Sequence, residues 1–89
     1  MAKLYRVLGE DFEIAPYQRT TLMNASDAVF VLDDSDNKKI WIWIGKAAST
    51  RQKFNAARLA EKLDKEAGGG PVIKTIDEGE EPQEFFDMF

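Results

Sequence analysis

Two apolar runs that flank a short polar segment constrain the fold of this chain more than any other feature. The runs are Ala28–Leu32 and Lys39–Gly45, and Asp33–Lys38 lies between them. Uninterrupted runs rich in β-branched and aromatic residues indicate strands that are buried on both faces. We therefore predict a central hairpin in a sheet that is covered on both sides. Trp41 and Trp43 share one side of their strand by two-residue periodicity and are expected to be core residues.

A long helix is predicted after the hairpin. Ser49 and Gln52 have the spacing of a capping box, so the helix should run from Thr50 to about Ala67. The segment Gly68–Pro71 should end it, because glycine favours the C′ position and proline blocks continuation. Positions at helical spacing form the predicted core face of this helix, namely Ala56, Leu59, Ala60, Leu63 and Ala67.

The remaining elements are shorter. Turns are expected at 9–11 and 24–27, and Thr20–Met23 is expected to be a short strand or an extended approach. Pro82 fits the first position of a short final helix that carries Phe85, Phe86 and Phe89. Other strands are predicted at 4–8, 12–15 and 72–76. The order predicts one mixed α/β domain of the α+β type over residues 1–89. The start at Met1 and the helical end favour a whole small protein.

The composition excludes several classes of function. The chain has no cysteine and no histidine, which removes disulfides, the usual zinc sites and the common nucleophile–base pairs. No carboxylate pair suited to hydrolysis is apparent, so we expect no enzyme activity, and any metal should be a hard, oxygen-ligated cation. The net charge of −4 argues against nucleic-acid binding. No segment predicts a membrane span or a signal peptide, and a cytoplasmic location fits.

Charge is distributed unevenly along the chain. Residues 38–65 contain eight bases against two acids, Glu61 and Asp64, whereas residues 76–89 contain six acids and no base. One interpretation is two solvated faces. The other is a basic helix that docks a partner, beside an acidic tail. On a helical wheel Phe54 lies opposite the core stripe among basic residues, and phenylalanine and arginine are favoured at interface cores.

Several motifs in order resemble a gelsolin-homology domain of the gelsolin, villin and severin family. The segments Leu4–Val7, Asp11–Ile14 and Leu22–Asp33 are similar to the opening of such a domain. The segment Ile40–Ser49 resembles the family's strand and its entry into the long helix, and Glu78–Phe86 resembles the "E-G-x-E-P-x-x-F" close. The resemblance implies a mixed sheet of about five strands between one long and one short helix.

The resemblance also implies a function. We expect a calcium-linked, cytoplasmic actin-binding module of the cytoskeleton, which sequesters monomers or caps barbed ends by docking its helix (about residues 50–67) in the actin cleft. Arg58 replaces an apolar residue of the family's first domain. The alternatives are a coat-type interaction domain without actin or calcium, and a weak phosphoinositide contact by the basic helix. The expected partner-binding residues are Arg51, Phe54, Arg58, Glu61, Lys62 and Lys65.

Two calcium (Ca2+) sites are implied by the same resemblance. At a site shared with actin, Asp64 and the carbonyls of Gly69 and Pro71 would supply part of the shell, and a cation would offset the helix dipole at that acid. Otherwise Asp64 is solvated or pairs with a lysine.

The second site lies within the domain and would use Ser26, Asp27 and a helical glutamate. Gln52 stands at the glutamate position, so we expect this site to be weak or lost. Alternatively, Asp27 caps a turn and Gln52 serves only the capping box. The Asp33–Asn37 segment fails the EF-hand pattern and is expected to be a turn.

Overall fold

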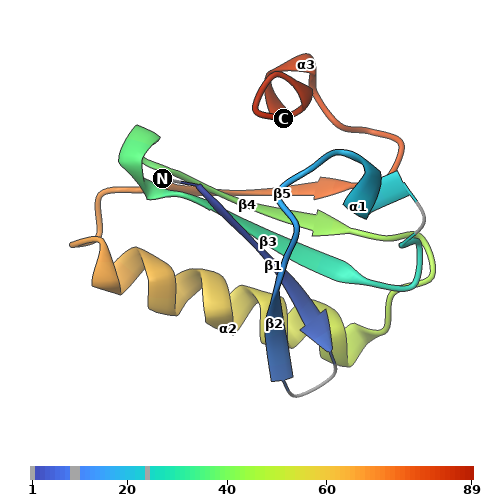
Figure 1. Ribbon diagram of the computed structural model, residues 1–89. Helices are drawn as coiled ribbons and strands as arrows, with labels where there is room; N and C mark the ends of the chain where they lie inside the picture. The colour runs from blue at the N-terminus through green and yellow to red at the C-terminus, as the bar shows by residue number, and fades with distance from the viewer. Residues whose placement is uncertain (1, 9–10, 24) are drawn as a thin grey trace.

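The computed structural model describes residues 2–8, 11–23 and 25–89 and shows a sheet between helices (Figure 1). The strands are ordered β2-β1-β3-β4-β5. In chain order the elements are β1 (Lys3–Leu8), β2 (Asp11–Ala15), α1 (Thr20–Met23), β3 (Val29–Asp34), the 3-10 turn η1 (Ser35–Asn37), β4 (Lys39–Ile44), α2 (Thr50–Glu66), β5 (Val72–Asp77) and α3 (Gln83–Phe86). The predicted fold class is confirmed.

The predicted central hairpin is confirmed as β3 and β4. They pair antiparallel in a register that runs from Val29 opposite Ile44 to Asp34 opposite Lys39. β1 pairs antiparallel with β3 on one side, and β5 pairs parallel with β4 on the other. A parallel pair needs a crossover connection, and α2 supplies it. The two apolar runs are therefore central because each has a strand on both sides.

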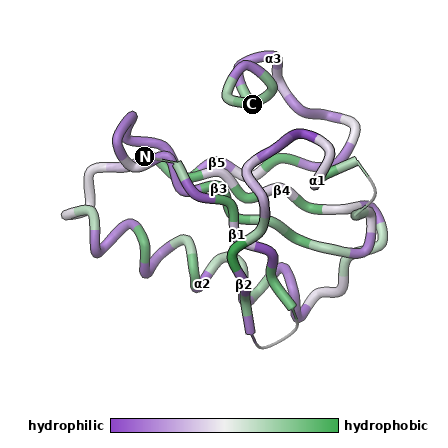
Figure 2. Tube along the Cα trace, viewed as in Figure 1, coloured by the Kyte–Doolittle hydropathy of each residue, from purple (hydrophilic) through white to green (hydrophobic). Residues whose placement is uncertain are grey.

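Each face of the sheet packs against its own helices, as the opposite positions of α2 and α3 in Figure 1 show. The hydropathy colouring of Figure 2 places the apolar segments in the middle of this arrangement. The core on the α2 side contains Val7, Val29, Val31, Ile40, Ile42, Ala56, Leu59 and Ala60. The core on the side of α1 and α3 contains Leu4, Ala15, Leu22, Ala25, Ala28, Phe30, Leu32, Trp41, Trp43 and Phe85. Both tryptophans are thus core residues, as predicted.

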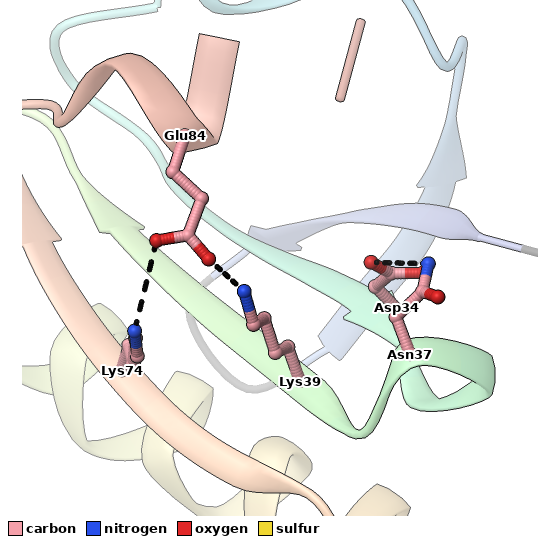
Figure 3. Close-up of polar contacts among 5 residues, drawn as sticks. All are labelled: Asp34, Asn37, Lys39, Lys74 and Glu84. Carbon is pink, nitrogen blue, oxygen red and sulfur yellow. Dashed lines mark hydrogen bonds and ion pairs between the residues drawn. The ribbon is translucent and has the colours of Figure 1, made fainter. Parts of the chain in front are cut away.

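The short helix α3 is fixed to the sheet by an aromatic contact and by charge. Phe85 is fully buried, and its ring lies 5.6 Å from that of Trp41. Glu84 forms ion pairs with Lys39 of β4 and Lys74 of β5 (Figure 3). The apolar residues of the C-terminal segment therefore pack on the sheet, as their spacing requires.

Thr20–Met23 is helical, so the prediction of a strand or an extended approach was wrong. Pro16 turns the chain here: its carbonyl accepts a hydrogen bond of 2.9 Å from the Thr21 hydroxyl. The resulting helical turn buries Leu22 against the sheet. A short segment of mixed polarity has no periodicity that distinguishes one helical turn from an extended strand.

Other predictions differ at the ends of elements. Pro82 precedes α3 as its N-cap and is not its first helical residue. Ala67 is exposed because α2 ends at Glu66, so it is not part of the core face. Parts of the turns predicted at 9–11 and 24–27 lie outside the described residues. No helix within the described ranges is long and apolar enough to cross a membrane.

The Asp33–Asn37 segment is a turn, as predicted. Ser35–Asn37 forms a single 3-10 turn. The Asn37 amide donates to both carboxylate oxygens of Asp34 at 3.1 and 3.2 Å (Figure 3). The Ser35 N–H donates to the Asp33 carboxylate at 3.1 Å. These carboxylates therefore satisfy local donors, which explains how Asp34 can be buried.

Candidate partner-binding face and calcium sites

The start of α2 has the geometry of a complete capping box. The Ser49 hydroxyl accepts from the Gln52 N–H at 3.1 Å, and the Gln52 side-chain oxygen accepts from the Ser49 N–H at 2.7 Å. Two of the otherwise unpaired N–H groups of the helix start are thereby satisfied. The sequence motif therefore fixes the first residue of α2.

The outer side of α2 faces solvent. Phe54 is 62% exposed, and the Arg58 guanidinium lies 5.9 Å from the centre of its ring. Glu61 and Lys62 are also exposed. We call this surface the basic face; it comprises all six residues predicted to bind a partner, namely Arg51, Phe54, Arg58, Glu61, Lys62 and Lys65. The structure brings the six together on one helix, and their role in binding stays a prediction.

An apolar extension of the basic face was not predicted from the sequence. Phe12 and Ile14 of the edge strand β2 are 48% and 70% exposed. They pair with Val7 and Tyr5, whose side chains pack on the α2 side of the sheet. A groove of about 330 Å³ separates β2 from α2, and its walls include Phe12, Arg58 and Lys62.

The two-residue spacing of Phe12 and Ile14 was the available signal for a shared strand face. It could not show that a groove separates this edge strand from α2.

The end of α2 leaves a carboxylate oxygen without a partner. Asp64 Oδ1 is buried and has no hydrogen-bond partner within the described residues. The following loop turns back onto the helix, because the Gly69 N–H donates to the Asp64 backbone oxygen at 2.8 Å. Gly68 and Gly69 adopt φ values of 82° and 76°, which glycine tolerates without strain.

A buried acceptor is costly when nothing donates to it, so Asp64 Oδ1 is suited to accept from a donor or to contact a cation. Within the described ranges, however, no group of three or more acidic residues could hold a metal ion. Asp64 and the carbonyls of Gly69 and Pro71 could supply only part of a calcium shell, and their role at a site shared with a partner stays a prediction.

The other predicted calcium site, at the start of α2, is occupied by hydrogen bonds. Gln52 and Asp27 are in contact, but the contact is a hydrogen bond and not shared coordination of an ion. The Gln52 Nε2–H group donates to the Asp27 backbone oxygen at 2.9 Å. The backbone oxygen of Ser26 accepts from the Ala47 N–H at 2.8 Å. The backbone oxygens of Ser26 and Asp27 thus accept from N–H groups of the protein, and the Gln52 amide directs an N–H group, not an oxygen, at Asp27.

Glu78 belongs to the same region and was missed by sequence reasoning. Its carboxylate accepts from the Lys46 N–H and from the Ser26 hydroxyl, both at 2.9 Å. The Lys46 N–H contributes most, and with the Ser26 hydroxyl it lowers the pKa of Glu78 below its usual value. Only the end of β5 carries Glu78 to this point, so no local motif could have revealed the contact.

The fold and the exposed helix define a small α+β domain with a basic, partly apolar surface along α2. A family model described as the gelsolin repeat matches residues 25–86. The chain is 36% identical over 87 residues to the cytoplasmic gelsolin of Homarus americanus, which covers 94% of this chain. It therefore belongs to the gelsolin family. The chain spans 11% of the length of that relative.

Two solved structures are similar over 99% of the chain. The Thorarchaeota 2DGel3 protein, solved in complex with rabbit actin, matches with a TM-score of 0.85 and 37% identity, and this chain covers 45% of it. The Thorarchaeota ProGel protein, also solved with rabbit actin, matches with a TM-score of 0.87 and 27% identity, and this chain covers 98% of it. The match to ProGel thus extends over nearly the whole of both chains.

Proposed function

We propose that this domain binds actin in the cytoplasm, as part of the cytoskeleton, and has no catalytic activity. The observation that carries the proposal is the similarity, over 99% of the chain, to two proteins solved in complex with actin. By binding it would sequester monomers or cap the barbed ends of filaments. The basic face of α2 is the proposed contact surface.

The chemistry of the basic face supports a protein partner. An exposed aromatic side chain beside an arginine is typical of the residues that contribute most to interfaces. Phe12 and Ile14 continue the apolar surface beyond the helix, across the groove that Arg58 lines. The surface can therefore bury an apolar centre at Phe54 within a ring of basic side chains.

We further propose that a calcium ion joins Asp64 to actin. The unpartnered Asp64 Oδ1 and the loop at Gly69 and Pro71 would hold one side of the ion. The bound ion would supply positive charge at the negative end of the helix dipole and vacant positions for oxygen atoms of actin. Binding that requires the ion makes the affinity for actin depend on calcium concentration by mass action.

A second candidate is an interaction domain that acts without calcium and without actin. The hydrogen bonds that occupy Ser26, Asp27 and Gln52 favour it, because they complete one predicted calcium site without an ion. It predicts that the basic face contacts some other protein.

Pyrene-actin assembly with rabbit actin, in calcium and then in a chelator, tests the proposal. We expect the domain to slow assembly or to cap filaments, and the effect to weaken in the chelator. An equal effect in both conditions would retain actin and reject the ion. No effect in either would reject the leading proposal in favour of the second candidate.

The contact surface is tested with a matched pair of variants. Phe54→Ala should weaken binding to actin roughly 30-fold or more, the range of a central aromatic contact. Met23→Ala serves as the control, because Met23 is 67% exposed, close to the 62% of Phe54, but lies beside Leu22 and Trp43 on the opposite side of the sheet. Equal loss in the two variants, or none in either, would show that the contact does not centre on α2.

A further inference from the structure

Three segments meet beside the start of α2, and hydrogen bonds join them. They are the turn at 25–28, the loop at 45–49 and the residues that follow β5. The Gly45 N–H donates to the Ala28 oxygen at 3.0 Å, and the Ala47 N–H donates to the Ser26 oxygen at 2.8 Å. The Glu78 carboxylate joins Ser26 to Lys46 across this junction. We call these segments the loop junction.

The Gln52 carboxamide connects the helix to the loop junction, and both of its polar atoms are used. Its oxygen accepts from Ser49 at 2.7 Å, and its nitrogen donates to the Asp27 backbone oxygen at 2.9 Å. A calcium ion is bound by oxygen lone pairs. An N–H group directed at the Asp27 oxygen satisfies that oxygen and presents positive charge to the position of a cation.

We infer that the Gln52 carboxamide takes the place of a metal ion in joining α2 to the 25–28 turn, so that the loop junction is complete without calcium. This inference concerns the domain alone and does not depend on actin binding. It assigns Gln52 two roles at once: its oxygen caps the helix, and its nitrogen replaces the cation. The capping box by itself would account only for the first.

A single substitution should reverse this replacement. In Gln52→Glu one carboxylate oxygen can still accept from Ser49, so the cap is retained. The other oxygen would face the Asp27 backbone oxygen, and two acceptors at hydrogen-bond distance repel each other. A calcium ion can bind both oxygens, with the Asp27 carboxylate available from the same residue. Such a variant should need the ion for its full stability.

The test measures thermal unfolding with millimolar calcium and with a chelator. All proteins carry Asp64→Asn, which removes the other proposed calcium ligand from the comparison. We expect the Tm of this parent to be the same in both solutions. The variant with Gln52→Glu in addition should have a lower Tm in the chelator, and calcium should raise it by roughly 5 °C or more. Calorimetric titration with calcium chloride should detect binding in that variant alone.

Two outcomes would overturn the inference. The first is a calcium-dependent rise in the Tm of the parent that Asp27→Ala abolishes, because the site would then be open. The second is a Gln52→Glu variant that folds but neither binds calcium nor gains stability from it, because the carboxamide would then not occupy a cation position. Neither measurement contains actin, so failure here leaves the proposed actin contact untouched, and failure of that contact leaves this result untouched.

Discussion

The two ends of α2 differ in whether their polar groups have hydrogen-bond partners within the domain. At its start, each polar group described here has a partner within the chain: Ser49 and Gln52 bond to each other, and Gln52 also bonds to Asp27. At its end, Asp64 Oδ1 is buried without a partner in the described residues. One end of the helix is thus complete within the domain, whereas the other has an acceptor that remains to be satisfied.

The difference between the two ends affects the free energy of unfolding of the free domain. A buried acceptor without a donor costs roughly 1–3 kcal/mol, whereas a satisfied helix cap stabilises a protein by about 1 kcal/mol. By this reasoning the start of α2 stabilises the free domain, whereas Asp64 Oδ1 contributes to stability only when a donor or cation reaches it. A cation or partner that satisfied Asp64 would remove this cost, so the end of α2 is where binding would gain most.

The largest expected effect on stability comes from a substitution at Gly45, which lies beside the start of α2. A Cβ atom at this position would lie 2.3 Å from the Ser26 backbone oxygen and 2.7 Å from that of Ala28. Gly45→Ala should destabilise the domain by about 3 kcal/mol, at the upper end for overpacking, because backbone atoms have to move. Urea denaturation measures this change.

Gly70→Ala is the matched control at the other end of α2. A Cβ atom there meets nothing within 4 Å, and the residue does not have a positive φ. We expect its free energy of unfolding to change by less than about 1 kcal/mol, with stabilisation if the unfolded chain loses entropy. Equal effects of the two substitutions would contradict the tight contact between Gly45 and the 25–28 turn.

The next effect separates binding from stability at Asp64. With calcium present, Asp64→Ala should weaken binding to actin about tenfold, which corresponds to about 1.4 kcal/mol. In the chelator the variant and the parent should bind alike. The free variant should be as stable as the parent or more so, since the substitution removes an unsatisfied buried oxygen. Affinities from fluorescence titration in the two solutions, with the Tm of each free protein, check these expectations.

A different result at Asp64 would change the comparison. If Asp64→Ala lowered the Tm of the free domain by several degrees, the carboxylate would have a structural role in the fold itself. Asp64→Asn distinguishes charge from shape, because it keeps the size of the side chain but supplies no negative charge to an ion.

The sequence predicted those parts of this arrangement that depend on local chemistry. The two apolar runs identified β3 and β4, and the spacing of Ser49 and Gln52 identified the start of α2 and its capping box. Each of these signals comes from residues that are close together in the sequence, where periodicity and capping chemistry act directly. The wheel likewise placed Phe54 on the solvent side of the helix, which its exposure of 62% confirms.

The features that were missed depend on contacts between distant segments. Glu78 reaches Ser26 across 52 positions of the chain. The exposure of Phe12 and Ile14 depends on the groove between β2 and α2, which no strand pattern specifies. The helical turn at Thr20–Met23 is set by the carbonyl of Pro16 and by the burial of Leu22. In each case tertiary packing determines the conformation or contact, and local propensity predicts it only weakly.

The smallest expected effect tests whether the loop junction stabilises the complete end of α2. Ser26→Ala removes one hydrogen bond to Glu78, while the Lys46 N–H still donates to the same carboxylate. Because Ser26 is exposed and water can replace its hydroxyl, the loss should be about 0.5–1 kcal/mol, or a fall in Tm of a few degrees. Thr50→Ala is a control at an exposed neighbouring position.

A loss of stability well above that range for Ser26→Ala would mean that the hydroxyl holds the whole 25–28 turn in place. A loss no greater than that of the control would mean that the backbone bonds of the turn suffice, and that Gln52 alone completes this end of the helix.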